Sequence, residues 1–143
     1  MLRRLKSFGL PSKELINIYK TFILPKLTYA SPAWSSSLNL TQKKMLEKVQ
    51  KRALKISLGT SYTTYEHALT AANLTKLEVY HNLMLREFGD KILSSERHRR
   101  LLPATLPTPH YPTRHANSIT PSRPDTERYK NSPIVTIVRM LNT

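Results

Sequence analysis

The chain has 143 residues, with 23 Lys or Arg against 9 Asp or Glu, so its formal net charge is +14. Such an excess of positive charge favours an anionic partner and says little about the fold. The absence of cysteine excludes disulfide bonds, iron–sulfur clusters, thiol catalysis and cysteine-based zinc sites, and no apolar run approaches the about 20 residues that cross a bilayer.

Proline and charge are unevenly distributed along the chain. Seven of the ten prolines lie beyond residue 102, whereas residues 1–60 carry 12 basic and 2 acidic side chains. We therefore predict an all-α fold, with a small bundle of about four helices over residues 1–102. A Pro-rich, basic and largely disordered tail is expected over residues 103–143. The helix-start pattern before Pro133 favours a short terminal helix within it.

The first long helix is predicted to begin at Ser12, with Glu14 in its first turn and apolar residues at helical spacing after it. Pro25 falls inside this pattern. Because proline has no backbone N–H and its ring clashes with the preceding turn, we expect a kink or a break there. Pro32 is expected to end the helix.

The second helix is predicted to start at Thr41 as N-cap, with Leu40 and Met45 forming a hydrophobic staple. Gly59 stands where a left-handed C-cap residue is expected. The apolar residues at helical spacing predict one buried face, which consists of Met45, Leu46, Val49, Ala53 and Ile56.

Two shorter capping patterns follow. Thr63 with Glu66, and Thr75 with Glu78, have the spacing of capping boxes and predict a third and a fourth helix. Gly89 is expected to weaken the fourth helix near its end by about 1 kcal/mol relative to Ala. The predicted buried stripe of the fourth helix is Leu77, Tyr80, Met84, Phe88 and Ile92.

Lysines recur on the second helix at spacings of four, three and four residues, which places them on one face, opposite the predicted apolar stripe. A run of charge is usually a solvated face, but such a face normally mixes signs and only Glu47 interrupts this one. The alternative is a surface that contacts phosphates, binds in a salt-sensitive way and reads no bases. Its candidate residues are Lys44, Lys48, Lys51, Arg52 and Lys55, with Arg3 and Arg4 upstream.

A second basic cluster, formed by Arg97, Arg99 and Arg100, lies near the junction with the tail. It fits phosphate contacts or a localisation signal, and equally a solvated helix C-terminus, where cations suit the helix dipole. The basic N-terminus lacks the apolar stretch of a signal peptide. We expect an intracellular protein, either nuclear or cytoplasmic, with no membrane partner.

The helical spacing of four aromatic residues favours core packing over a base-stacking platform; these are Tyr19, Phe22, Tyr29 and Trp34. The five histidines show no metal-ligand spacing, so no metal site is expected. Asp90 and Asp125 are the only aspartates, and no paired-aspartate motif of two-metal polymerase chemistry is present. No catalytic residue is therefore assigned.

Three runs of sequence occur in an order typical of one family. They are LRRLKSFGLPSKELINIYKTFILPKLTYASPAW, LEKVQKRALKISLG and YEHALTAANLTKLEVYHNLMLREFGDKIL. Together they resemble the C-terminal, thumb and post-thumb part of LINE-type, jockey-like non-LTR retrotransposon reverse transcriptases. Residues 128–133 also resemble the end of such polyproteins. The matching positions include Leu2, Arg3, Arg4, Leu5, Gly9, Leu10, Tyr19, Pro25, Tyr29, Trp34, Val49, Gln50, Arg52, Gly59, Leu77 and Glu78.

The resemblance implies a helical thumb-like region that cradles a primer–template duplex of RNA, DNA or hybrid. The family's fingers, palm and paired-aspartate site, with its Mg²⁺, would lie upstream of Met1. The chain would then be a catalytically incomplete fragment of an RNA-directed DNA polymerase, without a cofactor of its own, whose partners are nucleic acid and the missing palm and fingers. The alternative is a small stand-alone basic helical module that binds nucleic acid or another protein.

Overall fold

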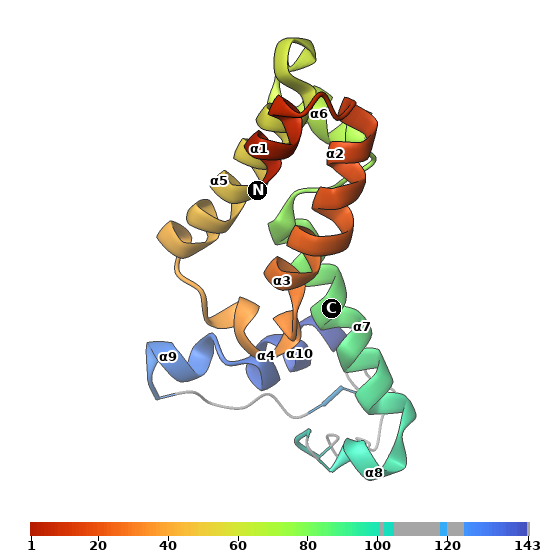
Figure 1. The fold of residues 1–143 in the computed structure, drawn as a ribbon. Coiled ribbons are helices and arrows are strands. Elements are labelled where there is room, and N and C mark those ends of the chain that lie inside the picture. The colour runs from red at the N-terminus through yellow and green to blue at the C-terminus, as the bar shows by residue number, and fades with distance from the viewer. Residues whose placement is uncertain (101, 105–117, 120–124, 143) are drawn as a thin grey trace. The chain divides into compact units, whose positions relative to one another are not determined.

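The computed structural model describes residues 1–100, 102–104, 118–119 and 125–142, and the regular elements of these residues are helical (Figure 1). The predicted all-α class is confirmed. Part of the predicted disordered tail, residues 105–117, 120–124 and 143, lies outside the described residues. The chain forms two compact units, which cut across the predicted division at residue 102.

Unit 1 comprises Met1–Ala30 and Leu38–His81, and unit 2 comprises Ser31–Ser37 and Asn82–Thr143. The elements of unit 1 are α1 (Leu2–Ser7), α2 (Ser12–Ile18), the π-helical turn η1 (Tyr19–Ile23), α3 (Leu24–Thr28), α5 (Leu40–Leu58), the 3₁₀ turn η3 (Gly59–Ser61), α6 (Tyr65–Ala72) and the start of α7 (Leu77–Ser94). Unit 2 holds α4 (Ser31–Trp34), the 3₁₀ turn η2 (Ser35–Ser37), the rest of α7, α8 (Glu96–Arg99), α9 (Glu127–Lys130) and α10 (Pro133–Leu141).

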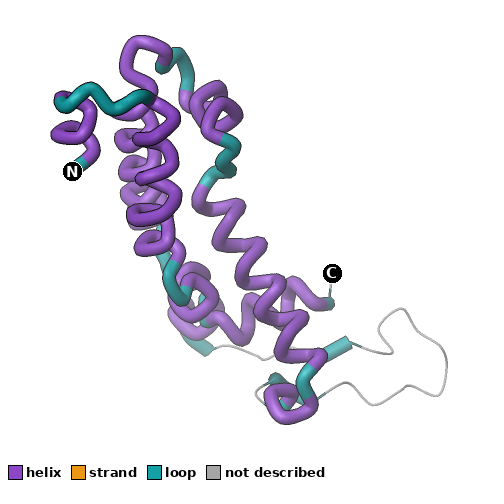
Figure 2. The backbone as a smooth tube through the Cα atoms, turned by 45° about the vertical axis from the view of Figure 1, so that its right-hand side comes forward, coloured by secondary structure: helices purple, strands orange, loops and turns teal. Residues whose placement is uncertain are grey.

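The break predicted at Pro25 is present as a change of helix type. Ser12 begins α2 as predicted, and the regular α-helix then gives way to the π-helical turn η1 before α3 places Pro25 in its first turn. Proline lacks the donor for the carbonyl of Thr21 and crowds it, and a widened turn relieves this crowding. Figure 2 shows the three segments following one another without a loop.

The predicted end of this helix at Pro32 is wrong. Thr28 is the last residue of α3, and Ala30 adopts a positive φ of 49°, which turns the chain out of the helix. Pro32 instead lies in the first turn of α4, where the missing N–H costs no helical hydrogen bond.

The start of α5 differs from the predicted one by two residues. Asn39, rather than Thr41, is the N-cap, and it forms a capping box in which its side chain accepts from Gln42 N at 2.8 Å. The predicted staple is absent because Leu40 and Met45 are 66% and 59% exposed. Gly59 ends α5 at the predicted position with a positive φ of 57°, but its ψ of −118° lies outside the predicted left-handed helical region.

The buried face of α5 is not the predicted one. Among the predicted residues Ala53 is buried, but Met45 and Val49 are exposed. The residues that α5 buries are Gln50, Ala53, Leu54 and Ser57. A pattern that counts only apolar residues points to the wrong face because two of these four side chains are polar.

The later helices show smaller shifts. Thr64, not Thr63, caps α6 by accepting from His67 N at 3.2 Å. The predicted stripe of α7 is displaced by about one position, because Phe88 is 44% exposed while Leu85 is 1% exposed. The buried residues of α7 are Leu77, His81, Leu85, Gly89 and Ile92.

Each unit has its own core. In unit 1, α1, α2 and α6 pack against α5, and its two apolar clusters centre on Leu15 with Tyr19 and on Leu54 with Leu69. In unit 2, aliphatic side chains form one cluster, which consists of Leu85, Ile92, Leu102, Ile119, Ile137 and Val138.

Gly89 has a packing role in unit 2 rather than being only a weak point of its helix. A Cβ at this position would lie 2.9 Å from Ile137 Cγ2, so glycine allows α10 to approach α7 closely. The predicted terminal helix is confirmed as α10, which begins at Pro133 after the N-cap Ser132.

Candidate nucleic-acid interface

The four lysines of the predicted stripe lie on the outer face of α5. At about 100° per residue they fall within one narrow sector, roughly opposite the sector of the buried Gln50 and Ser57. All are exposed, and within the described part of the chain no carboxylate pairs with them. The stripe comprises Lys44, Lys48, Lys51 and Lys55.

Glu47, the acidic residue within the stripe's sequence, is turned toward the inside of unit 1. One carboxylate oxygen accepts from the hydroxyl of Tyr65, and the other accepts from Leu77 N at 3.0 Å. Because both oxygens are engaged with residues of α6 and α7, the carboxylate does not reach out over the lysines. The outward face of α5 is therefore more uniformly positive than its sequence indicates.

A buried hydrogen-bond network holds α5 in this rotation. Gln50 is fully buried; its carbonyl oxygen accepts from the Tyr19 hydroxyl at 2.9 Å, and its amide donates to Thr75 O at 2.8 Å and to the Tyr65 hydroxyl at 3.2 Å. Burial raises the pKa of the Tyr65 hydroxyl, and the hydrogen bond to Glu47 raises it further. Burial also raises the pKa of Tyr19. Both tyrosines remain neutral donors.

Lys43, which lies beside the stripe, and Lys51, which belongs to it, each make a further contact. Lys43 Nζ pairs with Glu78 Oε1 at 3.1 Å, which ties the start of α5 to the start of α7. Lys51 Nζ lies 5.5 Å from the centre of the Tyr65 ring, a distance at which the ring face attracts a cation. Lys51 remains exposed and available to a ligand.

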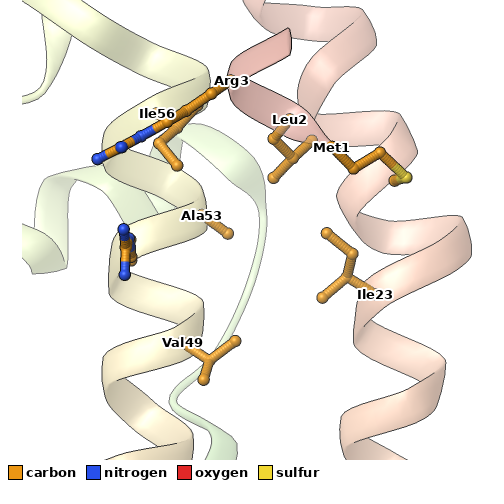
Figure 3. A pocket seen from close by; sticks show the side chains of 8 residues that line it. Met1, Leu2, Arg3, Ile23, Val49, Ala53 and Ile56 are labelled. Atoms are coloured by element: carbon orange, nitrogen blue, oxygen red, sulfur yellow. The ribbon is translucent and has the colours of Figure 1, made fainter. Parts of the chain in front are cut away.

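The upstream arginines are brought to α5 by the packing of α1. Lys6 Nζ donates to Ile56 O at 2.5 Å, close to the C-terminus of α5, where cations suit the helix dipole. Arg3 and Arg52 line a groove between α5 on one side and α1 with η1 on the other, which has a volume of about 390 Å³ (Figure 3). Arg4 is exposed on α1. The groove forms where α1 meets α5, so the spacing of residues within either helix could not predict it.

The second basic cluster belongs to unit 2. Arg97 and Arg99 lie in α8 and Arg100 follows it; Arg97 and Arg100 are exposed and Arg99 is half-buried. All three occupy the last turn of a short helix or the residue after it. Cations at this position interact favourably with the helix dipole. They do not join the lysines of α5 in one unit.

The prediction of core packing for the aromatic residues is confirmed only in part. Tyr19 is fully buried, but Phe22 and Tyr29 are 63% and 80% exposed, so core packing is wrong for these two. Trp34 is half-buried in α4. Phe22 lies within the π-helical turn η1 and Tyr29 follows the end of α3, so the regular α-helical spacing on which the prediction rests does not hold over these residues.

Among the described residues, no group of three or more His, Asp or Glu side chains is placed to hold a metal ion. No helix in the same residues has the length and apolarity needed to cross a bilayer. His81 is 5% exposed, and its Nε2 lies 3.1 Å from Leu27 O, so Nε2 donates to this carbonyl.

Comparisons of the chain with protein-family models, with curated proteins and with solved structures find no match.

Proposed function

We propose that unit 1 binds the phosphate backbone of nucleic acid through the lysine face of α5, without reading bases. The observation that carries the proposal is the inward position of Glu47, which leaves the lysine face without a carboxylate of its own helix. An unpaired cationic face of this kind suits a polyanion better than a mixed surface.

The spacing of the lysines fits a repeating anion. Side chains three or four residues apart on a helix are about 5–6 Å apart at Cβ, and long flexible lysine side chains can adjust to successive phosphates. Lys44 and Lys55 are separated by 11 residues, or about 16 Å along the axis. Several phosphates of one strand can therefore be contacted at once, which is the basis of salt-dependent binding.

The resemblance to the thumb and post-thumb part of a non-LTR reverse transcriptase supports the same reading. On this proposal the nucleic acid is a primer–template duplex, catalysis belongs to palm and fingers outside this chain, and the location is nuclear or cytoplasmic. We predict that the purified chain incorporates no nucleotides on any primer–template with Mg²⁺ or Mn²⁺. Template-dependent incorporation by a clean preparation would contradict this.

A salt titration of binding tests the proposed surface. Lys48→Gln with Lys51→Gln should weaken binding to RNA, DNA and hybrid duplexes, and should lower the slope of log affinity against log salt by about 2, since each lost phosphate contact removes about 0.9. Helix content should stay unchanged because Gln is nearly as good a helix former as Lys. The matched control, Lys13→Gln with Lys26→Gln, removes the same charge from exposed positions on α2 and α3.

Two outcomes decide the proposal. If the α5 double variant and the control double variant show equal slopes, overall charge and not the lysine face governs binding. A slope that falls only in the α5 variant supports the lysine face as the contact surface.

The alternative, a stand-alone module, differs from a fragment in its folding. A stand-alone module should be monomeric and melt cooperatively, whereas a fragment with an uncovered apolar face should aggregate.

A further inference from the structure

A groove in unit 1 lies beside the lysine face and is separate from it. Its volume is about 390 Å³, and it runs between α5 on one side and α1 with η1 on the other. Figure 3 shows Val49 and Ala53 of α5 directed toward the side on which Ile23 of η1 lies, with Leu2 of α1 at one end. The groove is therefore walled by aliphatic side chains from three elements.

The apolar strip of the groove continues along α5. Met45 lies four residues before Val49, on the same face of the helix, and the two side chains are 59% and 44% exposed. Both belong to the apolar pattern that predicts a buried face of this helix. The fold leaves them facing outward beside a groove, so a contiguous apolar surface on α5 stays uncovered within unit 1.

The edges of the groove are cationic. Arg3 and Arg52 are among its lining residues, and none of its lining residues is acidic. On α5, Arg52 falls between the sector of Met45 and Val49 and the sector of the lysine face, at about 100° per residue. A ligand seated in the groove thus has apolar contacts below it and positive side chains along one flank.

We propose that this groove receives an amphipathic helix of a partner protein whose polar face is acidic. The apolar residues of that helix would occupy the space between Ile23 and Val49, and its carboxylates would meet Arg3 and Arg52. This is the helix-in-groove mode of recognition, in which residues spaced by three and four anchor the ligand. The proposal concerns the groove and does not rest on nucleic-acid binding by the lysine face.

Charge selects this occupant over a second copy of the chain. The chain has a net charge of +14, and unit 1 alone carries 13 basic and 4 acidic residues. Bringing two such surfaces together places like charges opposite one another, which disfavours a dimer. An acidic helix is instead attracted by the opposite charge, which speeds its association and fixes its orientation.

The probe is a fluorescein-labelled peptide of about 18 residues, long enough to form a helix, with Leu at positions spaced by three and four and Glu on the opposite face. We expect saturable binding to the full chain by fluorescence anisotropy. A peptide with Gln in place of every Glu should bind more weakly because it cannot pair with Arg3 and Arg52. The variant Val49→Gln should weaken binding of the acidic peptide by about tenfold.

The matched control is Val79→Gln. Val79 is 57% exposed on α7 and does not line the groove, so this variant has the same change of side chain without the same location. Met45→Gln provides a second test at a residue that is more exposed than Val49, so it should fold and weaken peptide binding by a smaller factor. Circular dichroism confirms that the variants keep their helix content.

The outcomes separate this proposal from its rivals. Equal peptide affinity for the parent chain and Val49→Gln, or no saturable binding at all, overturns it. If Val49→Gln instead lowers affinity for oligonucleotides or abolishes a dimer seen by light scattering, the groove holds nucleic acid or a second copy, and the proposal is wrong. Weakened peptide binding with an unchanged salt slope for oligonucleotides supports it, even if Lys48→Gln with Lys51→Gln fails to alter that slope.

Discussion

The two units achieve a defined core by different means. Unit 2 packs aliphatic side chains, among them Leu85 and Ile137, and uses Gly89 to bring α10 close to α7. Unit 1 adds a buried hydrogen-bond network in which Gln50 joins Tyr19 of η1 and Tyr65 of α6. Aliphatic contacts are non-directional, whereas hydrogen bonds have strict geometry.

The difference matters for the surface each unit presents. In unit 1 the network sets the rotation of α5, and through it the inward position of Glu47 and the outward position of the lysines. In unit 2 the basic residues at α8 are close in sequence to Glu96, and the Asn142 side chain hydrogen-bonds the backbone of Ile119 in the core without engaging a charged residue. In unit 1, by contrast, directional core contacts turn the acidic side chain of α5 inward and leave the lysines outside.

The largest effect is expected from opening the aliphatic core of unit 2. Leu85→Ala should lower the free energy of unfolding by about 3 kcal/mol, because it removes buried methyl groups and leaves a cavity. Urea denaturation followed by circular dichroism measures this. Leu83→Ala, at a position 52% exposed on the same helix, is the control and should cost far less; equal losses would show that unit 2 does not depend on this core.

The second largest loss of stability is expected from removing the buried amide of Gln50 in unit 1. Gln50→Leu keeps the volume but leaves the buried Tyr19 hydroxyl and the partly buried Thr75 carbonyl without their partner, at a cost of about 2 kcal/mol. Tyr19→Phe removes one of these orphaned groups, so the double variant should cost less than the sum of the two single variants. Additive losses in the same denaturation experiment would argue against a coupled network.

Gly89→Ala sharpens the contrast by testing close packing. In an exposed helix this change usually stabilises by about 1 kcal/mol. Here the new methyl group meets Ile137 Cγ2, so overpacking should outweigh that gain and lower stability by about 1 kcal/mol. In an Ile137→Ala background the same change should become neutral or stabilising; a stabilising effect in the parent chain would mean that α10 moves aside freely.

The smallest effect is expected from pH, at the edge of unit 1. Burial lowers the pKa of His81 below its ordinary value of 6.5, with Lys43 lowering it further and Leu27 O and Glu47 opposing. The unfolded chain therefore takes up the proton first, and stability should fall as pH drops below about 6.5. His81→Gln keeps a donor for Leu27 O, so the stability of the parent relative to this variant should decline in that window. A pH-independent difference would show that His81 does not titrate differently in the fold.

Local chemistry determined several features from the sequence alone. Proline's missing N–H and its ring located the change of helix type near Pro25, and the Ser132–Pro133 pair located the start of α10. Glycine's freedom at positive φ located the end of α5 at Gly59. The spacing of the lysines placed them on one face of α5. Each of these depends on residues within about one helical turn of one another, so no tertiary information is needed.

Only the tertiary structure decided which face of α5 is buried. The apolar pattern points to Met45 and Val49, but the partners that satisfy Gln50 lie 15 to 31 residues away, on η1, α6 and the loop before α7. A buried amide is stable only when such partners converge on it, and that convergence cannot be read from local spacing. The inward Glu47, the uncovered apolar strip and the groove beside it all follow from this one choice of rotation.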